Sequence, residues 1–240
     1  MPSRKLTRSI VAGAAAIAVA GGSYGIVSAT SSSASTAASS SPAASSDSPA
    51  ASSGSGGGGS NARSGPAAGG SSGTVGSVST SGFTITTSAG QKVTVKEASS
   101  TTYQNGTSSA SASAITAGEP VLVLGTTSGT TITAAQVIVQ PAGGGSATSP
   151  AAKVIPFQRG APATSKQVGQ IPANYSQGSG TIVSGTAANK ATEAALAAYP
   201  GGIVDRVVKL SNGEYEVHYI GVNWPHHVFV NENFKVVGAG

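Results

Sequence analysis

The chain contains no cysteine, a single tryptophan and few charged residues. Without cysteine it can form neither disulfides nor thiolate metal sites, and it has no cysteine nucleophile. Charged side chains make up 9% of the 240 residues and aromatic side chains 5%. Large enzyme folds need long apolar elements and many polar site residues, so this composition argues against them. The 34 glycines and 12 prolines predict that much of the chain lies outside packed cores and that its folded parts are small.

The chain also lacks a concentrated basic region. Its net charge is +5, but Arg4, Lys5 and Arg8 supply three of those charges close to the N-terminus. The other basic residues are scattered, with no cluster interleaved with aromatic side chains. A nucleic-acid-binding surface needs such a cluster, so we expect no nucleic-acid partner.

The N-terminal residues 1–29 have the three parts of an export signal. A basic stretch at residues 4–8 precedes an apolar stretch at residues 10–20, and small residues lead to Ala29. The apolar stretch is too short to span the ~30 Å hydrocarbon layer of a membrane. We expect a secreted or cell-envelope protein, with two outcomes open: cleavage after Ala29, or retention of residues 10–29 as a membrane anchor.

Two segments have the composition of linkers. Residues 30–72 are mostly Ser, Ala, Gly, Thr and Pro, and residues 142–180 are rich in Pro and Gly. Such segments bury too little apolar surface to offset the entropy lost on ordering. The sequence therefore predicts a disordered tether at 30–72 and a second disordered linker at 142–180.

Between the linkers, residues 73–141 predict a small all-β, barrel-like module. Short runs rich in Val, Ile and Thr alternate with glycine-containing turns, which is typical of strands. The predicted strands are 74–78, 83–87, 92–96, 121–124 and 131–139. The run Val121-Leu-Val-Leu124 is apolar on both faces, so it should be the central, most buried strand. The order of these strands resembles a family of small exported bacterial β-modules of unknown function.

The C-terminal residues 181–240 predict a small α+β module. An Ala-rich helix should span residues 186–199 and end at Pro200-Gly201, because proline cannot continue a helix. Strands should follow at 203–210, 214–220, 226–230 and 234–237, the first two joined by an Asn212-Gly213 turn. The connections are short, so the module should be one helix on a three- to four-stranded antiparallel sheet.

The second of these strands has two different faces. Tyr215, Val217 and Tyr219 alternate with Glu214, Glu216 and His218. The first set should pack beneath the helix and the second should face solvent.

Three stretches of the C-terminal sequence follow a known pattern: Ala194-Ala-Leu-Ala-Ala-Tyr-Pro-Gly-Gly-Ile-Val, Gly213-Glu-Tyr-Glu-Val-His and His227-Val-Phe-Val. In these stretches the sequence resembles a PepSY domain, over about residues 184–237. PepSY modules occur in the propeptides of exported peptidases and in envelope proteins, where they are thought to bind or restrain proteases. The resemblance therefore implies a protein-binding role, and it brings no catalytic residues. No peptidase domain accompanies the module in this chain.

Reactive side chains are few. His218, His226 and His227 lie near Glu216, and one of the two adjacent histidines must share a sheet face with His218. These four residues are the candidate ligands if a metal were bound, but strand alternation lets only one of His226 and His227 join His218 and Glu216. That leaves three ligands where a closed zinc site needs four, so we expect ordinary histidines and no cofactor. No serine lies in the strand-to-helix context of a hydrolase, so we expect no enzyme.

We therefore predict an exported, non-enzymatic protein whose PepSY-like module binds or restrains an extracytoplasmic protein such as a peptidase. The candidate partner-binding residues are Glu214, Glu216, His218 and Trp224. Two alternatives stay open: a structural cell-surface spacer with no dedicated ligand, and a weak histidine-based metal-binding module.

Overall fold

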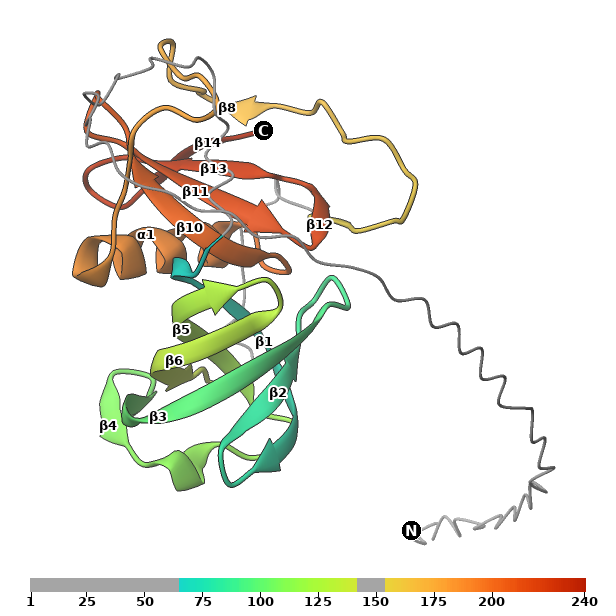
Figure 1. The fold of residues 1–240 in the computed structure, drawn as a ribbon, viewed down its shortest axis with the longest axis vertical. Coiled ribbons are helices and arrows are strands. Elements are labelled where there is room, and N and C mark those ends of the chain that lie inside the picture. The colour runs from blue at the N-terminus through green and yellow to red at the C-terminus, as the bar shows by residue number, and fades with distance from the viewer. Residues whose placement is uncertain (1–64, 142–153) are drawn as a thin grey trace, which may run out of the picture. The chain divides into compact units, whose positions relative to one another are not determined.

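The computed structural model describes residues 65–141 and 154–240, and all of them belong to one compact unit. The described chain is rich in β-sheet and contains one α-helix (Figure 1). The predicted export signal and most of the predicted tether lie outside these residues. Within the two described ranges, no helix has the length and apolar character needed to cross a membrane.

The N-terminal half of the described chain consists of strands and one short 3₁₀ helix, η1 (Ala112–Ala114) (Figure 1). The strands are β1 (Ala67–Ser79), β2 (Gly82–Thr86), β3 (Lys92–Asn105), β4 (Ser108–Ala110), β5 (Pro120–Ser128) and β6 (Thr131–Val139). β1 pairs with β2, β2 with β3, β3 in parallel with β6, β6 with β5, and β5 again with β1. The pairings therefore run in a ring, and β4 is added to β3. All five predicted strands are present.

β1 begins at Ala67, inside the segment predicted to be a disordered tether. Its first residues are small because the strand lies close to both of its neighbours. A Cβ on Gly69 would lie 2.0 Å from the carbonyl oxygen of Val204, and one on Gly70 would lie 2.2 Å from that of Val123. Glycine is the residue that allows so close an approach of backbones.

β5 is the buried central strand that its apolar run predicts. Val121 and Val123 point into the core of the N-terminal strands, together with Phe83, Ile85 and Ile132. Leu122 and Leu124 point the other way, into the core that contains the helix. A strand buried on both faces reads as a continuous apolar run rather than an alternating one.

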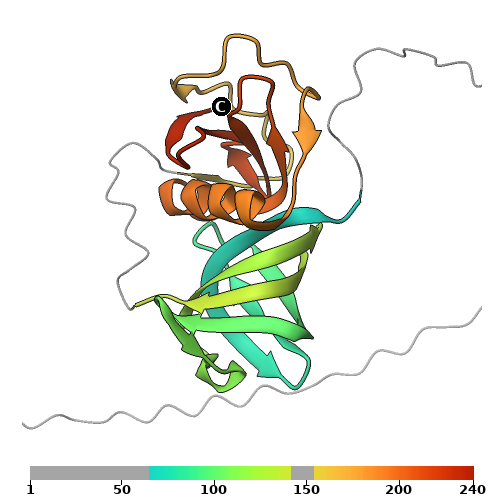
Figure 2. The same cartoon turned by 90° about the vertical axis from the view of Figure 1, so that its left-hand side faces the viewer.

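The C-terminal half consists of helix α1 (Gly185–Ala198) and four antiparallel strands in chain order. The strands are β10 (Ile203–Lys209), β11 (Tyr215–Ile220), β13 (His227–Val230) and β14 (Val236–Ala239). Figure 2 shows α1 lying across one side of these strands. Its buried alanines, Ala188, Ala191 and Ala195, share a core with Tyr215, Val217 and Tyr219, the face predicted to lie beneath the helix.

The segment 154–182, which we call the strap, contains three short strands, two of which pair with the C-terminal sheet, although its first 27 residues fall in the predicted linker. It contains β7 (Ile155–Pro156), β8 (Val168–Gly169) and β9 (Thr181–Ile182). β7 pairs with β12 (Val222–Trp224), β8 with β14, and β9 with β10. Apolar strap residues Ile171, Tyr175 and Ile182 pack against Val208, Leu210 and Phe229 on the sheet face away from α1.

The two halves share strands and core. β1 pairs with β5 over Ala67–Thr74 and also with β10, through Gly70 opposite Val204 and Ser71 opposite Ile203. The buried Ser71 hydroxyl donates a hydrogen bond to the carbonyl oxygen of Gly202 at 3.0 Å. Ile203 packs in the core of the N-terminal strands. Neither half therefore completes its core alone.

Candidate functional site

A group of polar side chains lies on the sheet face beneath the strap. We call it the His–carboxylate cluster, and its members are Asp205, Arg206, Glu216, His218, His227 and Tyr175. Arg206 on β10, His218 on β11 and His227 on β13 are directly opposite one another in the sheet register. Side chains opposite one another on neighbouring strands have Cβ atoms about 5 Å apart, so this row brings the three together.

A β-bulge brings Asp205 into the cluster. The register between β10 and β11 shifts between Val204 and Arg206, which leaves Asp205 as the extra residue. A bulge redirects side chains relative to a regular strand. The Asp205 carboxylate accepts a hydrogen bond from His218 Nδ1 at 2.6 Å and another from Arg206 Nη1 at 3.2 Å.

Glu216 is the most deeply buried member, with 0% of its side chain exposed. Its Oε1 lies 2.6 Å from His227 Nδ1 and accepts a hydrogen bond from the Tyr175 hydroxyl at 3.0 Å. Its Oε2 and the Nε of Arg206 are buried without a hydrogen-bond partner. A buried carboxylate is tolerated only where it is paired, so Glu216 depends on His227 and Tyr175.

Burial and the nearby Glu216 carboxylate raise the pKa of Tyr175 well above its ordinary value of 10.0. The Tyr175 hydroxyl therefore stays protonated, and remains a donor to Glu216, even in alkaline solution.

The face predicted to be exposed is therefore covered, and the prediction is wrong for Glu216. The strap lies over it, and Tyr175 contacts the rings of His227 and Phe229 at centroid distances of 5.7 and 4.8 Å. The described linker residues could not be recognised as a cover from their composition.

The histidines do not behave alike. The register brings His218 and His227 together, with ring centroids 5.2 Å apart. His226 lies outside this pair, and burial lowers the pKa of its imidazole below the ordinary value of 6.5. In residues 65–141 and 154–240, no group of three or more His, Cys, Asp or Glu side chains is placed to hold a metal ion.

The other two predicted partner-binding residues lie away from the cluster. Trp224 is fully buried, packs edge-on against Tyr199 at 5.5 Å, and donates its Nε1 hydrogen to the carbonyl oxygen of Lys166 at 2.6 Å. It is a core residue rather than an exposed anchor. Glu214 lies at the hairpin turn, where its carboxylate accepts a hydrogen bond from the Asn212 amide at 2.9 Å.

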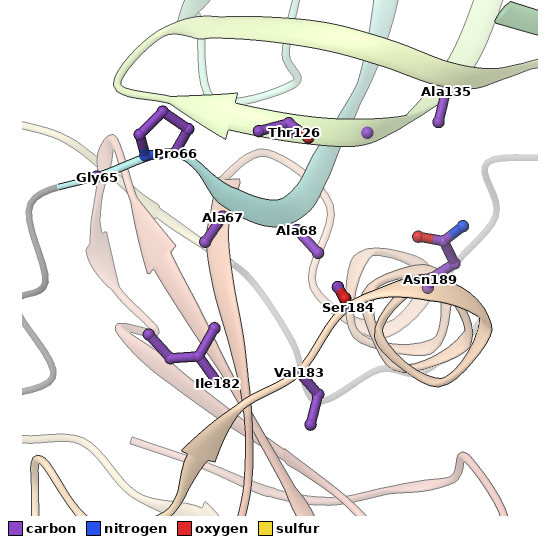
Figure 3. Close-up of a pocket in the computed structure, with 12 residues that line it drawn as sticks. Gly65, Pro66, Ala67, Ala68, Thr126, Ala135, Ile182, Val183, Ser184 and Asn189 are labelled. Carbon is purple, nitrogen blue, oxygen red and sulfur yellow. The ribbon is translucent and has the colours of Figure 1, made fainter. Parts of the chain in front are cut away.

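A second feature is an open groove of about 590 Å³ (Figure 3). It is lined mainly by small residues: Gly65, Pro66, Ala67, Ala68, Gly125, Thr126, Ala135, Ile182, Val183, Ser184, Gly185 and Asn189. The sequence identified no residue of this set as a binding residue, because small residues carry no binding signal.

The groove lies between two strand edges. On one side Ala67 and Ala68 pair with β5, and on the other Ile182 pairs with β10. Figure 3 shows these two stretches facing each other across the groove. β1 reaches β10 only at Gly70 and Ser71, and β9 reaches it only at Val208 and Lys209. Within the described chain, neither edge has a strand partner on the groove side.

The groove also ends at the start of α1. Ser184 occupies the N-cap position, but its hydroxyl makes no capping hydrogen bond. The first amide groups of a helix have no partner within the helix, so those of α1 can donate to a group in the groove.

Comparison with known proteins identifies no relative whose site could be compared with this one. No family model, no curated protein and no solved structure matches the chain.

Proposed function

We propose that this is an exported, non-enzymatic protein that binds an extended segment of an extracytoplasmic protein, such as a peptidase, in the groove between β1 and β9. The observation that carries the proposal is the pair of strand edges, at Ala67–Ala68 in β1 and at Ile182 in β9, that border one groove without pairing across it.

Unpaired strand edges recognise extended polypeptide. A peptide that adds to a sheet edge gains main-chain hydrogen bonds, and the pockets beside the edge select its side chains. Here a bound segment could pair with both edges, and the α1 amides could bind one of its carbonyl groups. The groove lining contains no charged side chain, so we expect a partner segment of small and apolar residues.

The resemblance to PepSY modules supports the same class of partner. Such modules are thought to bind or restrain peptidases. Pairing of a peptidase segment with a sheet edge would hold the peptidase by its main chain. The proposed location rests on the predicted export signal at residues 1–29, which favours secretion or attachment to the cell envelope. The ring of paired N-terminal strands is, in this proposal, an OB-type barrel that supports β1 as one border of the groove.

Filling the groove tests the proposal. Ala135 is exposed at the groove and outside both cores, so Ala135→Trp should block the groove without disturbing the fold. Thr94→Trp is the matched control, because Thr94 is exposed on β3 and does not line the groove. Each variant would be used to isolate partners from secreted and envelope proteins of the source cells, with circular dichroism as the folding check.

We expect a reproducible partner with the unchanged protein and Thr94→Trp, and its loss with Ala135→Trp. A partner that Ala135→Trp still binds would place the binding surface elsewhere. The absence of any partner would favour the spacer alternative.

A further inference from the structure

We propose that His218 and His227 form a binding site for a divalent transition-metal ion, coordinated through the Nε2 atoms of both rings. This site lies in the His–carboxylate cluster and is independent of the groove and of the function proposed for it.

The first support is the placement of the two rings. They project from directly opposite positions on β11 and β13, with centroids 5.2 Å apart. Both strands are interior strands of the sheet, so their backbones are held on both sides. The ring planes are inclined by 64°. A centroid separation of this size lets two imidazoles reach one ion, and sites on strands are more precise than sites on loops.

The second support is what each ring does with its other nitrogen. Nδ1 of His218 lies 2.6 Å from Asp205, and Nδ1 of His227 lies 2.6 Å from Glu216. A carboxylate accepts hydrogen bonds, so in the neutral ring Nδ1 carries the hydrogen and Nε2 carries the lone pair. Histidines that bind metals show this arrangement: a carboxylate behind the ring fixes its tautomer and raises the basicity of the ligating nitrogen.

The third support is charge and access. Asp205 and Glu216 bring two negative charges to the cluster, and Arg206 brings one positive charge that its contact with Asp205 partly neutralises. With neutral imidazoles, one negative charge remains, which favours a cation. The side chains of His218 and His227 keep 15% and 17% of their surface exposed, so the rings are not sealed from solvent.

The chemistry of the ligands defines the ion. Imidazole nitrogen suits zinc, copper and nickel, whereas calcium and magnesium prefer oxygen ligands. The protein supplies two ligands, and water or a small molecule would complete the coordination, which distinguishes this site from a closed structural zinc site.

The chain contains three histidines and no cysteine, so each imidazole can be tested in turn. Zinc binding to the untagged full chain would be measured by calorimetry. We expect one zinc ion per chain, a loss of affinity of at least about tenfold in His218→Ala and in His227→Ala, and unchanged affinity in His226→Ala. Glu216→Gln, which keeps the shape of the side chain, should weaken binding by about 10- to 100-fold.

Electron paramagnetic resonance of bound Cu²⁺ provides a readout on the unsubstituted protein, in case a variant fails the circular dichroism check. Two coordinated imidazole nitrogens would support the site. The proposal would be overturned by no saturable zinc binding up to about 1 mM, by a loss in His226→Ala equal to that in His218→Ala, or by a copper spectrum without two imidazoles.

Discussion

At the scale of single residues, close backbone contacts explain a stretch of sequence that shows no recognisable pattern. Residues 67–72 have the composition of a flexible linker, yet they form the strand that joins the two halves of the fold. Composition could not predict this strand. Its glycines are required by the closely packed backbones of neighbouring strands, and those strands come from distant parts of the chain. The same holds for Asp205, which only a bulge brings to His218.

Gly202 gives a direct test of such packing. A Cβ at this position would lie 2.1 Å from Cδ1 of the fully buried Tyr219 ring. Gly202→Ala should therefore lower the free energy of unfolding by about 1–3 kcal/mol, the usual cost of overpacking a core. Gly65→Ala is the control, since nothing lies within 4 Å of its added Cβ. Urea denaturation measures both, and equal stabilities would contradict the packing described.

Tyr175 tests the buried carboxylate. Tyr175→Phe removes a donor from Glu216, whose side chain is 0% exposed, and should cost about 1–3 kcal/mol of unfolding free energy. Tyr103 donates a similar hydrogen bond, 2.9 Å long, to the partly exposed Glu97. Tyr103→Phe should cost less, because water can replace the lost donor. Chemical denaturation measures the unfolding free energies of both variants. A larger loss of stability in Tyr103→Phe than in Tyr175→Phe would contradict the role of Tyr175 in stabilising the buried Glu216.

The burial of His226 predicts that the stability of the fold depends on pH. Burial lowers its pKa in the folded state below the ordinary value of 6.5, so the unfolded chain binds the proton more readily. The contribution of His226 to stability is therefore complete above pH 6.5 and decreases as the pH falls below that value. His226→Gln should make stability fall less steeply below pH 6.5 than in the unchanged protein. Unfolding free energies measured from pH 5 to 8 test this, and parallel curves would refute it.

At the scale of elements, the strong hydrophobic patterns predicted strands and their buried faces, whereas the very short strands could not be predicted. The run at 121–124 predicted the central strand, and the alternation in β11 predicted which face meets α1. β7, β8 and β9 have two residues each, too few to show a period, and their surroundings are rich in proline and glycine. The strap, and with it the cover over Glu216, could therefore not be predicted from the sequence.

At the scale of the whole molecule, the two predicted modules share one sheet and part of their cores. Leu122 and Leu124 complete the core around α1, and Ile203 completes the core of the N-terminal strands. The fragment 154–240 should therefore be markedly less stable than 65–240, because separation exposes both surfaces. Urea denaturation followed by circular dichroism compares the two, and equal midpoints would show that the halves are energetically independent.

The groove is also a property of the whole molecule, since its two edges belong to different halves. The most direct measurement places a photo-crosslinking residue, in separate variants, at Ala67, at Ile182 and at the control position Thr94, in cells that export the protein. If an extended segment lies between the edges, Ala67 and Ile182 will be linked to the same partner protein and Thr94 will not. Adducts at Thr94 as strong as those at the two edges, or different partners at the two edges, would contradict the account.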